Sequence, residues 1–186
     1  MTRLDAERTI ARELEPNERL VWSGAPRQGL ALRPADMMLI PFSLLWGGFA
    51  IVWEAGVLRA GAPMPFPLFG IPFVVIGLYL IFGRFFVDAN IRANTAYGLT
   101  DRRVIIVSGL VNRSVKSLQL KTISDVTLAE QSDGTGTITF GPSLPMARWT
   151  AGAAWPGASN YAAPSFDMIS RARDVYGSIR DAQGGR

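Results

Sequence analysis

Two long apolar segments joined by a short connector constrain this chain more than any other feature. The first covers residues 37–58 with Glu54 as its only charged residue, and the second covers residues 66–86 with no charge before Arg84. About twenty helical residues, at ~1.5 Å each, cross the ~30 Å hydrocarbon layer of a bilayer. The pattern therefore predicts two membrane spans in a helical hairpin, with residues 59–65 as the connector.

The hairpin divides the chain into three regions: an N-terminal segment (1–36), the hairpin (37–86) and a C-terminal domain (87–186). Charged residues make up 18% of the sequence, against ~25% in an average soluble domain, because the hairpin is so apolar. The last region is long enough to bury a core of its own, whereas the first is not.

Basic residues near the spans predict their orientation. Arg27 and Arg33 precede the hairpin and Arg84 and Arg92 follow it, while the connector has Arg59 alone. Loops rich in lysine and arginine stay on the cytoplasmic side, so we expect both termini in the cytoplasm. The net charge of +4 is also compatible with nucleic acid or anionic lipid headgroups, but its place beside the spans favours this topological role, and we expect no nucleic-acid partner.

Small and polar residues within the spans suggest how the hairpin packs. Gly47, Gly48, Gly70 and Gly77 offer flat surfaces either for contact between the two helices or for a homodimer seam. Glu54 is a possible intramembrane polar site, since an ionisable residue in a span is a functional candidate. It lies near the end of its segment, so it either snorkels to the interface or forms a proton or ion site.

The region before the hairpin carries weaker signals. Residues 2–14 predict a short amphipathic helix that lies on the membrane surface, docks on the later domain or frays. Residues 19–23 alternate like a strand before the turn signal Gly-Ala-Pro.

After the hairpin, short β-rich runs alternate with turns. Strands are predicted at residues 95–100, 103–108, 115–120, 123–130 and 136–141, followed by a long loop at residues 142–164. Residues 165–182 predict a closing helix with Ser165 as its N-cap and an apolar stripe through Phe166, Ile169, Ala172, Tyr176 and Ile179. Consecutive antiparallel strands that end in one helix indicate an α+β sheet or barrel.

The residue inventory argues against catalysis. Cysteine and histidine are both absent, which excludes disulfides, thiolate nucleophiles, histidine bases and Cys/His zinc sites. The glycines of residues 134–141 fall within a strand pattern and lack the lysine of a phosphate loop. We therefore expect no enzyme activity, no metal and no cofactor.

Five basic residues lie in or beside the first three strands of the C-terminal domain: Arg102, Arg103, Arg113, Lys116 and Lys121. They are candidates for contact with anionic lipid or with a partner, at about 1 kcal/mol per basic side chain near a charged membrane surface. The alternatives are a solvated basic face and a pair with Asp101 that stabilises its turn.

The run from Tyr97 to Gly109 (YGLTDRRVIIVSG) resembles the bacterial pleckstrin-homology-like (PH-like) domain of small multi-pass membrane proteins. Two further stretches match that family, ERLVWSGAP at residues 18–26 and GTGTITF at residues 134–140, with two spans between the first and the domain. The resemblance implies a bent sheet of seven strands closed by a C-terminal helix, with two of the strands between Pro142 and Pro164.

Together these features predict a multi-pass protein of the bacterial inner membrane. We expect a non-enzymatic adaptor whose domain binds a membrane protein, a second copy of itself or anionic lipid headgroups at the cytoplasmic face. The alternative is an accessory subunit of a transport or channel complex that uses Glu54.

Overall fold

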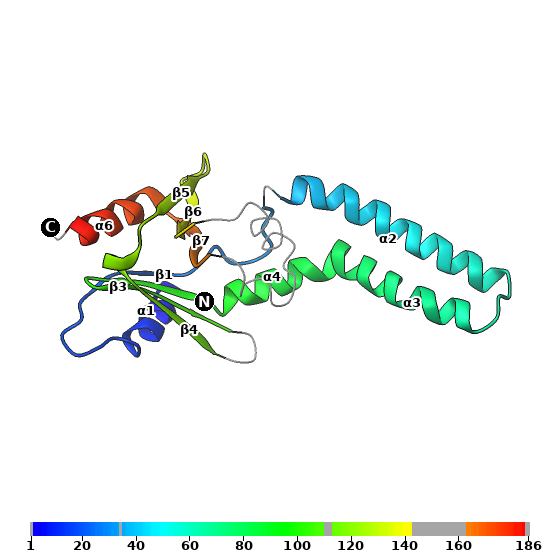
Figure 1. Cartoon of the computed structure of the whole chain (residues 1–186), viewed down its shortest axis with the longest axis horizontal. Coiled ribbons are helices and arrows are strands. Elements are labelled where there is room, and N and C mark those ends of the chain that lie inside the picture. The colour runs from blue at the N-terminus through cyan, green and yellow to red at the C-terminus, as the bar shows by residue number, and fades with distance from the viewer. Residues whose placement is uncertain (1, 34, 110–112, 143–162, 185–186) are drawn as a thin grey trace.

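The structure, a computed structural model, describes residues 2–33, 35–109, 113–142 and 163–184. A compact domain lies at one end and a pair of long apolar helices extends from it (Figure 1). The helices are α1 (Arg3–Ala11), α2 (Asp36–Arg59), α3 (Pro65–Leu78), α4 (Arg84–Ala93) and α6 (Ala172–Gly184), with a π-helical turn (Tyr79–Gly83) between α3 and α4. The strands are β1 (Leu20–Gly24), β2 (Ala96–Thr100), β3 (Arg103–Ser108), β4 (Ser114–Gln119), β5 (Val126–Glu130), β6 (Thr135–Phe140) and β7 (Ser165–Ser170).

Helices α2 and α3 pack through glycine, as one of the two sequence alternatives predicts. A methyl group placed on Gly77 would lie 2.7 Å from the Cα of Gly47, so Gly77 has no room for a side chain. Gly48, by contrast, has no atom within 4 Å of such a methyl group. The second helix continues without a break from Pro65 to Ala93, beyond the predicted end of the span near residue 86.

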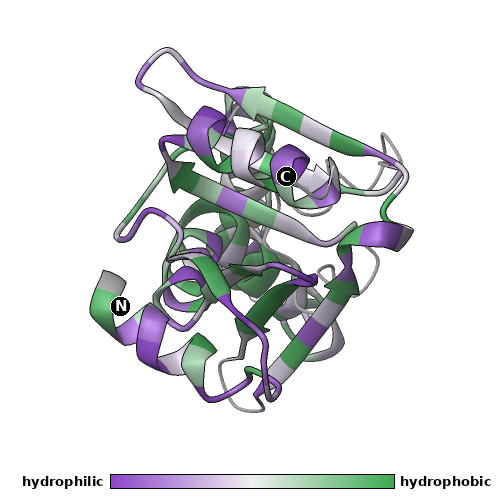
Figure 2. Ribbon diagram, turned by 90° about the vertical axis from the view of Figure 1, so that its left-hand side faces the viewer, coloured by the Kyte–Doolittle hydropathy of each residue, from purple (hydrophilic) through white to green (hydrophobic). Residues whose placement is uncertain are grey.

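Two antiparallel sheets form the domain, with strand orders β1-β2-β3-β4 and β5-β6-β7. Apolar residues occur along the strands of both sheets (Figure 2). On β6, buried residues alternate with half-buried ones, whereas β2 is buried throughout and β3 is buried from Val104 to Val107. Phe166 on β7 lies at the centre of the core, with its ring centroid 4.9 Å from that of Tyr97 and 5.0 Å from that of Phe140. Val175 and Ile179 of α6 close this core from the side.

Helix α1 covers the opposite face of the first sheet. Its Ala6 and Ile10 are fully buried in a second cluster with Ala96, Ile105 and Val107. Of the alternatives for residues 2–14, the docked helix is therefore the correct one. Gly98 makes this approach possible, because a methyl group there would lie 2.5 Å from the Ile10 side chain.

The hairpin is inserted into the first sheet between two neighbouring strands. Strand β1 precedes both long helices, and its partner β2 follows them, with Gly24 opposite Tyr97. The domain is therefore joined to the hairpin by two covalent connections, residues 25–35 and the helix α4.

The sequence prediction for residues 165–182 is wrong in its first third. Residues 165–170 form strand β7, paired with β6 from Ser165 opposite Thr139 to Ser170 opposite Thr135. Arg171, with φ of 51°, separates this strand from helix α6. The strands expected between residues 142 and 164 fall almost entirely outside the described residues.

Candidate functional site

Arg103, one of the five predicted contact residues, lies in an ion pair at the end of the first sheet. Its Nε donates to Oε1 of Glu18 over 2.8 Å, and its Nη2 donates to Oε2 over 2.9 Å. Thr100 adds a hydroxyl bond to Oε1 at 2.8 Å. These bonds favour the ionised form of Glu18, and the bond from the Arg103 guanidinium has the largest effect. The pKa of Glu18 therefore falls from 4.5 to about 2. Arg103 thus fastens the N-terminal segment to the sheet.

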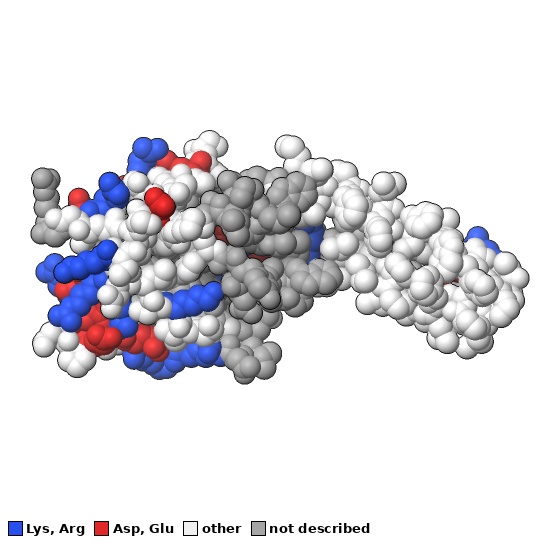
Figure 3. Space-filling view, viewed as in Figure 1, with Lys and Arg blue, Asp and Glu red and all other residues white. Residues whose placement is uncertain are grey.

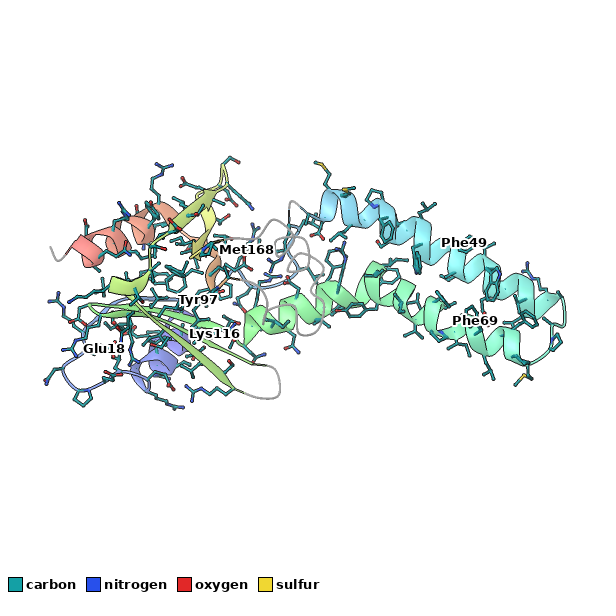
Figure 4. All side chains as sticks on the ribbon, viewed as in Figure 1. Glu18, Phe49, Phe69, Tyr97, Lys116 and Met168 are labelled. Carbon is teal, nitrogen blue, oxygen red and sulfur yellow. The ribbon has the colours of Figure 1, made fainter. Side chains whose placement is uncertain are left out.

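Arg102 and Lys121 lie at the same end of the domain as this pair. The amide of Leu120, next to Lys121, donates to the carbonyl of Arg102 over 2.9 Å. Strand β2 begins just after α4 and runs away from the hairpin, so this turn is at the far end, where Figure 4 labels Glu18. These residues are therefore remote from the two apolar helices.

The other two predicted contact residues are on or beside β4. Arg113 pairs with Glu13 at 2.6 Å, and Lys116 lies opposite Ile106 in the middle of the strand. The five basic residues consequently do not form a single cluster, and at least two of them have acidic partners from residues 13–18. Their contact with lipid or with a partner stays a prediction.

Glu54 lies against the facing helix. A methyl group on Gly70 would come within 1.8 Å of its Oε2, and this oxygen is buried without a hydrogen-bond partner. The absence of a side chain at Gly70 thus provides the space that the carboxylate occupies between α2 and α3.

A network of four charged residues, which we call the ionic joint, connects the hairpin to the domain. It consists of Arg33 before α2, Asp88 and Arg92 on α4, and Asp167 on β7. Arg33 contacts Asp88 and Asp167, each at 2.7 Å, and Arg92 contacts Asp88 at 2.9 Å. Two cations and two anions balance, so the joint has no net charge.

Burial and hydrogen bonds make the ionic joint rigid. Burial alone would lower the pKa of Arg33, but Asp167 and Asp88 outweigh it and raise the pKa overall. Asp167 also accepts a hydrogen bond from Thr137 over 3.0 Å, and its amide donates to the Tyr97 hydroxyl over 3.1 Å. Burial raises the pKa of this tyrosine, which is therefore neutral at physiological pH.

Arg92 extends the ionic joint to the chain between β1 and α2. Its guanidinium donates to the carbonyls of Arg27 and Gly29, the second over 2.8 Å, and its side chain is 3% exposed. Arg84, Asp88 and Arg92 are four residues apart and share one face of the helix. Asp36 pairs with Arg84 at 2.7 Å, so residues 27–36 are held along this face.

The sequence indicated no such joint. Arg33 and Arg92 were informative only about orientation, because their acidic partners cannot be identified without the fold. Arg33 and Asp167 are 134 positions apart. The spacing of charges on residues 84–92 was the one available signal, since it places three of them on one helical face.

A groove of about 270 Å³ lies between the end of β1 and the first turns of α6. Its walls include Trp22 and Ser23 from one side and Arg171, Asp174 and Ser178 from the other. The volume is at the lower limit of small-molecule sites, which typically have ~300–1,000 Å³. The serine hydroxyls and the opposite charges of Arg171 and Asp174 are suited to hydrogen bonding with a short polar segment.

No group of three or more potential metal ligands occurs among the residues that the structure describes.

The comparison with known proteins identifies a family for this chain. A family model described as "Bacterial PH domain" matches residues 45–178, from within α2 into α6. No curated protein and no solved structure matches the chain. The family match covers well over half of the sequence and confirms the resemblance of residues 97–109; the chain belongs to the bacterial PH domain family.

Proposed function

We propose that this protein is a non-enzymatic binding module that the α2–α3 hairpin anchors in the bacterial inner membrane, with both termini in the cytoplasm. Its family supports the general role, since PH-like domains are mostly binding modules without catalysis. The anchor restricts the domain to partners at or near the membrane surface.

The exposed apolar surface of the hairpin carries the proposal. Only 22% of the most apolar window of α2 is buried, and 11% of that of the second helix. A core helix of a soluble protein would instead be mostly covered. Phe49 and Phe69, labelled in Figure 4, are 71% and 64% exposed. At ~1.5 Å per residue, the 24 residues of α2 reach about 36 Å, enough to cross a bilayer.

The distribution of charge supports the same arrangement. Charged residues gather over the domain, while the visible surface of the hairpin is nearly free of them except at its tip (Figure 3). A uniformly uncharged surface over the length of a bilayer matches hydrocarbon and not water.

A protein is the favoured partner, with the groove between β1 and α6 as its site. Trp22, on a wall of the groove, has a ring 5.4 Å from that of Phe166, so a rigid aromatic group is present at the contact. Anionic headgroups are the weaker candidate, because Arg103 and Arg113 already have glutamate partners and the turn at Arg102 is remote from the hairpin.

Site-specific photocrosslinking tests the partner. A photoreactive residue replaces Ser178 on the groove wall or, as the control, the exposed Arg180, which is about 200° away around α6. In native membranes, we expect a discrete protein adduct from position 178 and none from position 180. Equal or absent adducts at both positions would refute the groove as the binding site.

Alkaline carbonate extraction tests the anchor on the same membranes. An integral protein stays in the pellet, whereas a peripheral one is released. Release of the intact chain would contradict the membrane anchor whatever the crosslinking shows.

A second candidate function is that of an accessory subunit in a transport or channel complex. The buried, unpartnered Oε2 of Glu54 favours it, since such groups in spans often belong to ion or proton pathways. Ion flux into proteoliposomes, measured with the intact chain and with Glu54→Gln, separates the two. Equal flux in both would exclude this role for Glu54.

A further inference from the structure

Two leucines are exposed at the base of the hairpin. Leu30 and Leu32 lie in the connection between β1 and α2, which we call the linker (residues 25–35), and are 66% and 68% exposed. Isolated exposed leucines are common on protein surfaces. These two, however, lie in the chain that leads into α2, and further apolar side chains are exposed at the base of both helices, Met37 at 86% and Phe86 at 66%.

The exposure of these leucines belongs to a fixed loop. The buried guanidinium of Arg92 binds the carbonyls of Arg27 and Gly29 just before Leu30. Arg33, just after Leu32, is held by Asp88 and Asp167. Both ends of the short leucine segment are therefore anchored, and its apolar side chains are presented outward in a defined position.

The spacing of these anchors along α4 gives the height of each leucine. Arg84, Asp88 and Arg92 are separated by four residues, or about 6 Å along the helix axis. The guanidinium of Arg33 contacts Asp88, and the carbonyl of Gly29 accepts a hydrogen bond from the guanidinium of Arg92. With the hairpin upright, the leucine segment therefore lies beside the stretch of α4 from Asp88 to Arg92, about 6–12 Å below Arg84, with Leu32 nearer to Arg84 in the chain.

The upper part of this range lies within the headgroup layer of a bilayer. The layer occupies about 5–8 Å on each side of the hydrocarbon core, and the core would end near Arg84, where charge first appears on the helix. We infer that Leu30 and Leu32 insert into the headgroup region of the cytoplasmic leaflet, as a second membrane contact beside the hairpin. This inference rests on the membrane anchor of the proposed function, and it adds that the linker fixes the tilt of the domain.

The absence of cysteine from the sequence allows a direct test. Single cysteines replace Leu30, Leu32, Phe49 or Leu4 and carry a nitroxide, in the full chain reconstituted into phosphatidylethanolamine–phosphatidylglycerol vesicles. Leu4 on α1 is the matched control, because it is 67% exposed and belongs to the helix that covers the first sheet, outside both the linker and the hairpin. Phe49 reports the hydrocarbon core. Collision with oxygen measures lipid exposure, and collision with a water-soluble nickel chelate measures water exposure.

We expect collision with the chelate to decrease in the order Leu4, Leu30, Leu32, Phe49, with Leu32 several-fold below Leu4 and a parallel rise in collision with oxygen. If Leu30 and Leu32 match Leu4 while Phe49 reports lipid, the inference is overturned and the anchor stands. If both leucines are shielded from oxygen and chelate alike, protein covers them and the inference is again wrong. If Phe49 itself matches Leu4, the membrane anchor fails and the inference fails with it.

Discussion

The Glu18–Arg103 pair allows the most quantitative prediction. Glu18→Gln keeps the size of the side chain and removes its charge. The pKa of Glu18 falls from 4.5 to about 2, and at about 1.4 kcal/mol per pKa unit this corresponds to roughly 3 kcal/mol of folding free energy. The side chain of Glu18 is 0% exposed, so solvent does not screen the interaction. We therefore expect the variant to lose about 3 kcal/mol at neutral pH.

The contribution of Glu18 to stability should change with pH in a defined direction. A carboxyl group with a lowered pKa stabilises the fold while it is ionised, so its full contribution is present above about pH 4.5. That contribution decreases as the pH falls towards about 2, where the native carboxylate takes up its proton. The difference in stability between the two proteins should therefore be constant near neutrality and close to zero at pH 2.

Pulse proteolysis in urea, on the full chain in detergent micelles, measures this difference at each pH. Glu15→Gln is the matched control, because Glu15 also contacts Arg103, at 3.1 Å, but its side chain is 59% exposed. An exposed pair contributes about 0–1 kcal/mol, so this variant should resemble the wild type. Equal losses in the two variants, or a Glu18→Gln difference that does not vary below pH 4.5, would show that burial of the pair is not the cause.

Three further substitutions test the ionic joint and the hairpin. Asp167→Asn removes one anion from the joint and should cost about 3 kcal/mol in pulse proteolysis of the domain; a wild-type midpoint would mean that the contact with Arg33 adds nothing to stability. Gly77→Ala forces a methyl group against Gly47 and should weaken helix packing by about 1–3 kcal/mol in detergent unfolding, whereas Gly48→Ala, which meets open space, should not. Glu54→Gln should preserve or raise hairpin stability in the same assay, since an unpartnered carboxylate oxygen becomes part of a neutral amide; a loss of stability would show that the charge itself is needed.

Local sequence patterns predicted the elements that depend on local signals. The turn at Asp101 and Arg102 between two β-rich runs was placed correctly, and β2 and β3 flank it. The glycine contact between α2 and α3 was also predictable, because close helix packing requires small residues at matching heights.

Strand β7 was missed because its apolar residues fit a helical spacing better than a strict alternation. Phe166 and Ile169 fit a helical stripe with Ala172, and all three are indeed buried, but the first two are in a strand. The register shift between Gly136 and Ile138 on β6 disturbs the simple alternation that would have indicated a strand. Pairing with β6 decides the outcome, and that long-range contact leaves no local pattern.

The ionic joint was missed for a related reason. Single charged residues say little about partners that are 55 or 134 positions away. The basic residues near the hairpin suggested only an orientation, whereas in the fold their guanidinium groups are used to hold the linker and β7 against α4.

The insertion of the hairpin between β1 and β2 also affects how the protein is made. On the ribosome, β1 emerges long before β2, its partner among the strands that the structure describes, since residues 25–95 separate them. Close packing of α2 on α3 brings these distant ends together and shortens the effective loop that the sheet must close. In the arrangement proposed above, membrane integration of the hairpin precedes completion of the domain. A chain whose hairpin failed to close would keep β1 and β2 apart, so completion of the first sheet depends on the packing of α2 on α3.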